Sequence, residues 1–171
     1  MKDTYLVGNY SINCKGNLID LSTPKIMSIV NTTPDSFYDG GKYNTIEKAL
    51  QKVELDISNN TTFIDVGGYS SKPNANHVTE EEELKRTIPT VEAILNSFPK
   101  AVISIDTFRG KVAKEAIEAG AAMINDISAF ELDKEMINTL STYRVPYVLM
   151  HMQGTPQNMQ KNPCYENVVK D

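Results

Sequence analysis

The stretch IMSIVNTTPDSFYDGG, residues 26–41, decides the fold that this sequence predicts. Its first five residues are mostly apolar, and the next eleven concentrate carboxylates, hydroxyls, an amide and paired glycines. An apolar strand that ends in such a loop is typical of α/β proteins, which keep their chemistry at the carboxyl ends of strands. Because Pro, Asp, Ser and Gly also suit turns, this loop taken alone could equally be a plain surface turn.

The same pattern recurs along the chain. Short apolar runs end in polar residues or paired glycines at residues 63–66, 102–105, 121–124 and 147–150. Between the runs, apolar residues recur at helical spacing, and we expect helices at about residues 44–58, 79–95, 110–118 and 133–141. Asn44 with Glu47, and Thr79 with Glu82, are placed as helix-capping pairs. Apolar strands that alternate with amphipathic helices predict a parallel sheet covered by helices, with the polar strand ends at one edge.

Strand spacing favours a TIM (β/α)8 barrel over a doubly wound sheet. Strand starts about 30 residues apart scale to roughly 265 residues for eight units, a normal barrel size, whereas the chain has 171 residues. A doubly wound sheet would usually carry a GxGxxG or GxxxxGKS/T loop, and the sequence has neither. We therefore predict an α/β fold with one partial barrel domain at residues 25–171, comprising about the first five β/α units. Residues 1–24 should form a β-hairpin leader, turning near Lys15 and Gly16, that could cover the barrel floor.

Composition and charge exclude several classes of function. The chain is 40% hydrophobic and 23% charged, as in ordinary soluble globular proteins. Its net charge of -5 leaves no basic stripe for neutralising nucleic-acid phosphates. Neither a signal peptide nor an apolar run of membrane-spanning length is visible, so we expect a cytoplasmic protein with no nucleic-acid or membrane partner. Cys14, Cys164, His77 and His151 lack disulfide or metal-ligand spacing, although His151, at a strand end, could line a site.

Together, the strand-end motifs resemble the dihydropteroate synthases, a family of pterin-binding enzymes in folate biosynthesis. Residues 31–41 are similar to the family's first signature, N-x-T-P-D-S-F-x-D-G-G, and residues 65–73 to its second, D-x-G-G-E-S-T-R-P. Residues 104–107 resemble its S-x-D-T motif, residues 124–127 its I-N-D-V/I motif, and residues 150–160 its segment after strand five. These blocks occur in the family's order and cover nearly the whole chain after residue 24, which chance does not explain.

The resemblance implies a transferase that joins 6-hydroxymethyl-7,8-dihydropterin diphosphate to p-aminobenzoate, giving 7,8-dihydropteroate and pyrophosphate. A Mg²⁺ ion would neutralise the leaving diphosphate, and the family's metal contact corresponds to Asn31, whose carbonyl oxygen suits that hard cation. If the diphosphate leaves first, as the family mechanism implies, a cationic methylene forms, and nearby carboxylates would stabilise it.

The resemblance also assigns binding roles at strands three to five. Asp106 and Asn125 would hydrogen-bond the pterin ring, while Ile127 and Met150 would provide apolar walls. Judged by residue type alone, Asp106 could instead be a helix N-cap and Asn125 a turn former. Ile127 and Met150 could equally be plain core.

Two glycine-flanked loops would close over the second substrate and exclude water. By resemblance, Phe37 and Pro73 flank the aminobenzoate ring. Asp39 would act near the cationic centre or help to order the loops, and Ser71 and Lys72 would meet the diphosphate or bridge the loops.

The sequence departs from the family pattern in the second loop and at its end. Tyr69, Ser71 and Lys72 stand where the family has Glu, Thr and Arg, so anion binding should persist in a less directional form and the role of Tyr69 stays open. The family's later signatures, D-P-G-x-G-F-G-K, S-R-K and R-x-H, do not occur before Asp171. We therefore expect a truncated dihydropteroate synthase, whose full-length form could be a homodimer.

Two rival interpretations remain open. One is a methyltetrahydrofolate-dependent methyltransferase-like barrel, which the T-P-D-S-F-x-D-G-G loop disfavours because a methyl donor has no diphosphate to release. The other is a partial barrel without catalytic activity.

Overall fold

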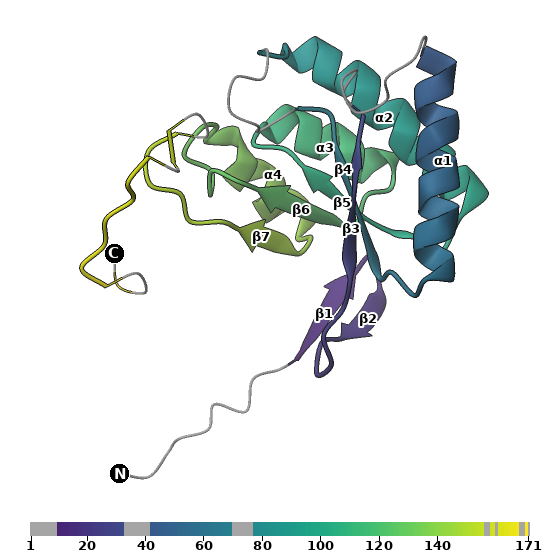
Figure 1. The fold of residues 1–171 in the computed structure, drawn as a ribbon, viewed down its shortest axis with the longest axis horizontal. Helices are drawn as coiled ribbons and strands as arrows, with labels where there is room; N and C mark the ends of the chain where they lie inside the picture. Colours follow the sequence, from purple (N-terminus) through teal and green to yellow (C-terminus); the bar gives the residue numbers. More distant parts are fainter. Residues whose placement is uncertain are drawn as a thin grey trace.

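The computed structural model describes residues 10–32, 42–69, 77–155, 158–159, 161–167 and 170 and, of residues 42–45, only the backbone. The expected alternation of strands and helices is present (Figure 1). The strands are β1 (Ser11–Cys14), β2 (Asn17–Asp20), β3 (Met27–Asn31), β4 (Phe63–Gly67), β5 (Val102–Asp106), β6 (Met123–Asp126) and β7 (Tyr147–Leu149). The helices are α1 (Lys42–Ser58), α2 (Glu80–Ser97), α3 (Gly110–Ala119) and α4 (Glu135–Tyr143).

Element boundaries differ from the expected ones in two instructive places. Thr79 caps α2 as predicted, because its hydroxyl accepts a hydrogen bond from the Glu82 amide at 3.2 Å. The predicted cap at Asn44 is wrong, since α1 already begins at Lys42. Strand β6 begins two residues later than predicted, because the Ala121 amide still donates to the Ala116 carbonyl at the end of α3.

The order of the strands identifies the type of sheet. The five strands β3 to β7 are parallel and lie in chain order, each bonded to the next. Consecutive helices also pack against one another, α1 on α2, α2 on α3 and α3 on α4, on one side of the sheet (Figure 1). A doubly wound sheet would reverse its strand order and place helices on both faces. The arrangement is that of consecutive β/α units in a barrel wall.

The core lies between the sheet and the helices. Alternate strand residues Val30, Val66, Ile105 and Ile124 point toward the helices and are fully buried. They pack against buried helix residues that include Val53, Ala49, Val91, Ile94, Ala113, Ala116 and Met136. Because strand side chains alternate between faces, the residues next to them in sequence must point away from the helices.

The predicted hairpin is present at residues 11–20, where it covers the amino ends of the strands, whereas residues 1–9 of the predicted leader lie outside the described residues. Strands β1 and β2 pair antiparallel across Lys15 and Gly16, whose φ angles of 51° and 89° suit a two-residue hairpin turn. Cys14 of the hairpin is buried with Phe63 and Met123, the first residues of β4 and β6. This is the position expected for the floor of the barrel.

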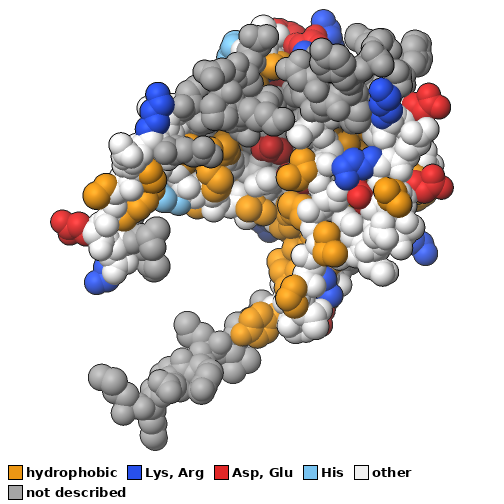
Figure 2. All heavy atoms as spheres, in the orientation of Figure 1, with side chains coloured by type: hydrophobic (Ala, Val, Ile, Leu, Met, Phe, Trp, Pro, Cys, Tyr) orange, Lys and Arg blue, Asp and Glu red, His pale blue; other side chains and the backbone are white. Residues whose placement is uncertain are grey.

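The face of the sheet away from the helices is concave and partly apolar. Ile29 of β3 and Val148 of β7 are 59% and 40% exposed there. Figure 2 shows hydrophobic side chains along the hollowed side of the molecule. Among the described residues, no helix combines the length and the apolar character that crossing a membrane requires.

Candidate active site

The polar strand ends form a single row across the sheet. Asn31, Gly67, Asp106 and Asn125 are partners in register on the adjacent strands β3 to β6. They alternate with the core-facing residues, so their side chains belong to the concave face. The sequence predicted that polar strand ends would lie at one edge, and the register brings Asn31, Asp106 and Asn125 together there.

Gly67 keeps the middle of this row open. A Cβ atom at this position would lie 3.4 Å from Asn31 Oδ1 and 3.5 Å from Asp106 Oδ2. The side-chain oxygens of Asn31 and Asp106 therefore flank the space above the Gly67 backbone. Gly67 itself puts no side chain into that space, so among the described residues the space is available to a ligand group.

A second polar layer lies two residues deeper in the strands. Asp65, only 4% exposed, accepts a hydrogen bond from Asn125 Nδ2 at 3.0 Å. Within the described residues, Asp65 Oδ1 and Ser104 Oγ are buried with no well-formed hydrogen bond. The family motifs contain both residues, but the sequence analysis assigned neither of them a role. The sequence feature that could have identified them is the alternation of strand side chains, which places Asp65 and Ser104 on the same face as Gly67 and Asp106.

The electrostatics of this site favour neutral carboxyl groups. Burial raises the pKa of Asp106 to about 7, and the negative charges of Asp65, Glu83 and Asp126 add to the rise. Burial also raises the pKa of Asp65, which the neighbouring Ser104 and Asn125 side chains only partly offset. Near neutral pH the Asp106 carboxyl is thus available both as a hydrogen-bond acceptor and, when protonated, as a donor.

The start of the first signature loop is fixed to the site. The Thr32 amide and hydroxyl both donate to the Gly67 carbonyl, at 2.9 and 3.1 Å. Phe37 and Asp39 of this loop lie outside the described residues, as do Ser71, Lys72 and Pro73 of the second loop. Their roles stay predictions.

The loop after β6 is held by Asp126. Its carboxylate accepts hydrogen bonds from the amide and hydroxyl of Ser128 at 2.7 and 2.8 Å, the Phe130 amide at 2.9 Å and the Tyr147 hydroxyl at 2.7 Å. These bonds hold Ala129 and Phe130 at φ angles of 48° and 57°, a left-handed conformation that residues other than glycine rarely adopt. Asp126 therefore acts as a structural anchor beside the site.

Ile127 and Met150 are placed beside this anchor at the ends of β6 and β7. Both residues are half-buried, and the Met150 amide donates to the Asp126 carbonyl at 3.3 Å. This position is compatible with an apolar wall next to Asn125. His151, which follows Met150, has its ring 5.4 Å from that of Tyr165.

A buried ion pair, which the sequence did not reveal, supports the strand ends from behind. Glu83 of α2 is fully buried and forms a salt bridge with Arg109. The Thr107 hydroxyl donates to the same carboxylate at 2.6 Å, and the Thr107 backbone amide donates to the backbone carbonyl of Asn125 at 3.0 Å. Burial raises the pKa of Glu83, and the Thr107 hydroxyl and the Arg109 charge counteract that rise.

The donor set at the row is compatible with Mg²⁺ but does not form a metal cage. Among the residues that the structure describes, no group of three or more His, Cys, Asp or Glu side chains could hold a metal ion. Mg²⁺ commonly takes one or two protein oxygens and completes its shell with substrate phosphates and water. Asn31 Oδ1 and Asp106 Oδ2, on either side of Gly67, fit that pattern.

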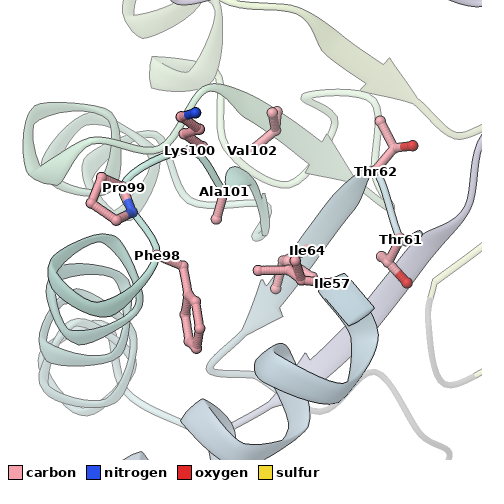
Figure 3. A pocket seen from close by; sticks show the side chains of 9 residues that line it. All are labelled: Ile57, Thr61, Thr62, Ile64, Phe98, Pro99, Lys100, Ala101 and Val102. Carbon is pink, nitrogen blue, oxygen red and sulfur yellow. The ribbon is translucent and has the colours of Figure 1, made fainter. Parts of the chain in front are cut away.

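An apolar cavity of about 390 Å³ lies at the opposite end of the strands (Figure 3). Its lining comes from the carboxyl ends of α1 and α2 and the starts of β4 and β5, and includes Ile57, Ile64, Phe98 and Val102. None of its lining side chains is a carboxylate, and the cavity is remote from the polar row. The candidate site is therefore the row and not this cavity.

Comparison with known proteins gives a consistent result. The chain matches the family of pterin binding enzymes over residues 27–171. It is 46% identical over 153 residues to the dihydropteroate synthase of Haemophilus influenzae, covering 90% of this chain and 55% of that enzyme. The Yersinia pestis dihydropteroate synthase in a sulfonamide drug complex superposes with a TM-score of 0.81 at 40% identity, over 93% of this chain and 57% of the other. The Xanthomonas albilineans dihydropteroate synthase with 4-aminobenzoic acid superposes with a TM-score of 0.80 at 38% identity, over 94% of this chain and 55% of the other.

The fold and the polar row define a protein of the TIM-barrel class, of which this chain forms five consecutive parallel strands, the four helices between them and a hairpin floor. The chain belongs to the pterin binding enzyme family, as the strand-end motifs indicated. It spans about half the length of the curated relatives it matches.

Proposed function

We propose that the protein carrying this chain is a dihydropteroate synthase, condensing 6-hydroxymethyl-7,8-dihydropterin diphosphate with p-aminobenzoate. The observation that carries the proposal is the row of Asn31, Gly67, Asp106 and Asn125 at the carboxyl edge of a pterin-binding fold. The Xanthomonas relative, whose structure contains 4-aminobenzoic acid, supports the choice of second substrate.

The geometry suits recognition of the pterin ring, which presents amide, amino and ring-nitrogen groups along one edge. Because Asn125 Nδ2 donates to Asp65, the other side-chain atom of the amide, Asn125 Oδ1, is the one that would accept a hydrogen bond from a ring N–H. Asp106, with its pKa of about 7, can accept from the ring as a carboxylate or donate to it as an acid. Ile127 and Met150 would flank the ring with apolar surface.

In the proposed reaction the C–O bond between the pterin methylene and the diphosphate breaks, and its electron pair leaves with the diphosphate. The aminobenzoate nitrogen then forms the new C–N bond with its lone pair and loses one proton. The ionised form of Asp106, which is populated near neutral pH because the pKa is about 7, would stabilise positive charge that develops on the pterin and its methylene. Within this proposal, Asp39, Ser71, Lys72, Phe37 and Pro73 keep the roles that the resemblance implies.

The proposal includes Mg²⁺ bound through Asn31, with Asp106 Oδ2 beside it. When bound, the ion would neutralise charge on the leaving diphosphate. The space above Gly67, with an oxygen on each side, supports this placement. Cytoplasmic location and a homodimeric full-length form also stay predictions.

A product assay tests the proposed function. The purified protein is incubated with both substrates and Mg²⁺, and dihydropteroate and pyrophosphate are quantified together. We expect equal amounts of the two products, dependent on Mg²⁺. Methyl transfer from methyltetrahydrofolate to a cobalamin acceptor, with no dihydropteroate formed, would contradict the proposal.

A further inference from the structure

The Arg109 side chain connects parts of the molecule that are distant in sequence. Arg109 is 9% exposed and follows Asp106 by three residues. Its Nη1 pairs with Glu83 and its Nη2 donates to the Val78 carbonyl at 2.7 Å. Its guanidinium carbon also lies 5.4 Å from the centre of the Tyr69 ring. One planar cation thus holds three partners at once, which the single ammonium of a lysine could not do in the same geometry.

Two of these partners bracket the second signature loop. Tyr69 lies immediately before residues 70–76, and Val78 lies two residues after them. The Tyr69 ring also makes edge contacts with Phe108 and with His77, at centroid distances of 5.1 and 6.1 Å. Both ends of this part of the chain therefore converge on Arg109 and its neighbour Phe108.

The same network reaches the polar row through Thr107. The Thr107 hydroxyl donates to Glu83 and accepts from the Arg109 amide at 3.2 Å, while its amide donates to the Asn125 carbonyl. Tyr69 and Val78 are thus connected, through Arg109 and Thr107, to the strand that carries Asp106. Since Glu83 and Arg109 are buried, solvent does not screen their attraction as it does for a surface pair.

We propose that Arg109 is a positioning residue for the second substrate: it fixes the chain at Tyr69 and Val78 relative to the Asp106–Asn125 row. This inference rests on the proposed function for its kinetic consequence. It also explains why Tyr69 is accommodated where the family has a glutamate. The aromatic ring packs on the guanidinium and so contributes to the anchor without requiring a second carboxylate.

The kinetic test uses Arg109→Lys, which keeps a cation opposite Glu83 but loses the fork, and Tyr69→Leu, which removes only the aromatic contact. Misplaced substrate-positioning groups commonly cost up to about 100-fold, so we expect kcat/KM for p-aminobenzoate to fall about tenfold or more in each variant. The dissociation constant of 6-hydroxymethyl-7,8-dihydropterin, which lacks the diphosphate, should stay within about twofold, because neither residue contacts the row directly. Arg86→Lys is the matched control, since Arg86 pairs with Glu82 of its own helix at 2.9 Å and makes only a long contact of 3.4 Å with the Gly68 carbonyl.

A readout independent of activity keeps the two proposals separable. Hydrogen–deuterium exchange of the backbone amides of Tyr69, His77 and Val78 should be faster in Arg109→Lys and Tyr69→Leu than in the wild type and in Arg86→Lys. Unchanged exchange and unchanged kcat/KM in both variants would overturn the positioning role. A wild-type protein that forms no dihydropteroate would overturn the proposed function, while the exchange data would still decide whether Arg109 anchors the chain.

Discussion

At the amino ends of the strands, Phe63 and Met123 are buried among apolar side chains and covered by the hairpin. Toward the carboxyl ends, two residues below the polar row, Asp65 and Ser104 are equally buried, yet each leaves a polar atom without a well-formed hydrogen bond among the described residues. Burying polar groups without partners costs free energy, whereas burying apolar surface stabilises the fold. The two ends of one sheet therefore separate the residues that hold the fold from those available for chemistry.

The largest predicted effect is at the carboxyl end. Asn125→Ala removes the ring-facing amide and leaves Asp65 without its hydrogen-bond donor, and we expect kcat/KM to fall about 10²- to 10³-fold. Thermal unfolding should change by only a few degrees. Steady-state kinetics beside the exposed-helix control Asn138→Ala would check this. Wild-type kinetics in Asn125→Ala would contradict the assigned role.

At the amino end the same kind of truncation should act on stability instead. Phe63 is 5% exposed, so Phe63→Ala should lower the free energy of unfolding by about 3 kcal/mol. The control Leu132→Ala, at a position 46% exposed, should change it by less than about 0.5 kcal/mol. Urea denaturation measures both. If kcat/KM fell as much in Phe63→Ala as in Asn125→Ala, the separation of stabilising residues at the amino end from functional residues at the carboxyl end would be wrong.

The pH dependence of stability provides a third, smaller contrast. The pKa of Asp106 is raised from 3.8 to about 7 in the folded protein, so folding favours the protonated form. As the pH rises from 4 to 7, Asp106 ionises in the unfolded chain but stays protonated in the folded protein, so the free energy of unfolding falls. Above pH 7 Asp106 is ionised in both states, and the free energy of unfolding falls no further. Asp106→Asn should remove this loss, gaining about 2 kcal/mol on the wild type between pH 4.5 and 8. Calorimetric unfolding across that range should show the gain; a pH-independent difference between the two proteins is incompatible with the raised pKa.

The smallest effect should come from the Ser104 hydroxyl, which lies beside Asp65 but has no well-formed hydrogen bond among the described residues. Ser104→Ala removes a buried polar atom without breaking a well-formed hydrogen bond, so we expect the variant to be as stable as the wild type or more stable by about 0.5–1 kcal/mol. Chemical denaturation at pH 5 and pH 7 would measure the change. A loss of more than about 1 kcal/mol would instead mean that Ser104 stabilises Asp65.

Local sequence patterns predicted the sheet because each strand and each helix carries its own signal. Apolar runs and helical spacing gave the element order, and the polar residue that ends each strand gave the row at Asn31, Asp106 and Asn125. Once the strands are parallel and adjacent, their register brings these ends together without further information. The hairpin turn at Lys15 and Gly16 was predictable for the same local reason.

What the sequence did not predict depends on contacts between distant residues. The pairing of Glu83 with Arg109 joins positions on different elements, and a glutamate in an acidic first turn of a helix resembles an ordinary solvated residue. The left-handed conformation of Ala129 and Phe130 arises from the hydrogen bonds of Asp126, not from their own preferences. The expected Asn44 cap failed because capping patterns place helix ends only to within a few residues.

The central claim, that the carboxyl-end row is the pterin site, is tested most directly by calorimetric titration of 6-hydroxymethyl-7,8-dihydropterin diphosphate into three variants. Asp106→Ala and Asn125→Ala should each bind at least about tenfold more weakly than the wild type, since each loses a buried hydrogen bond to the ligand. Phe63→Ala, at the other end of the same sheet, should bind within about twofold of the wild type. Wild-type affinity in both row variants, or equal weakening in all three, would contradict the claim.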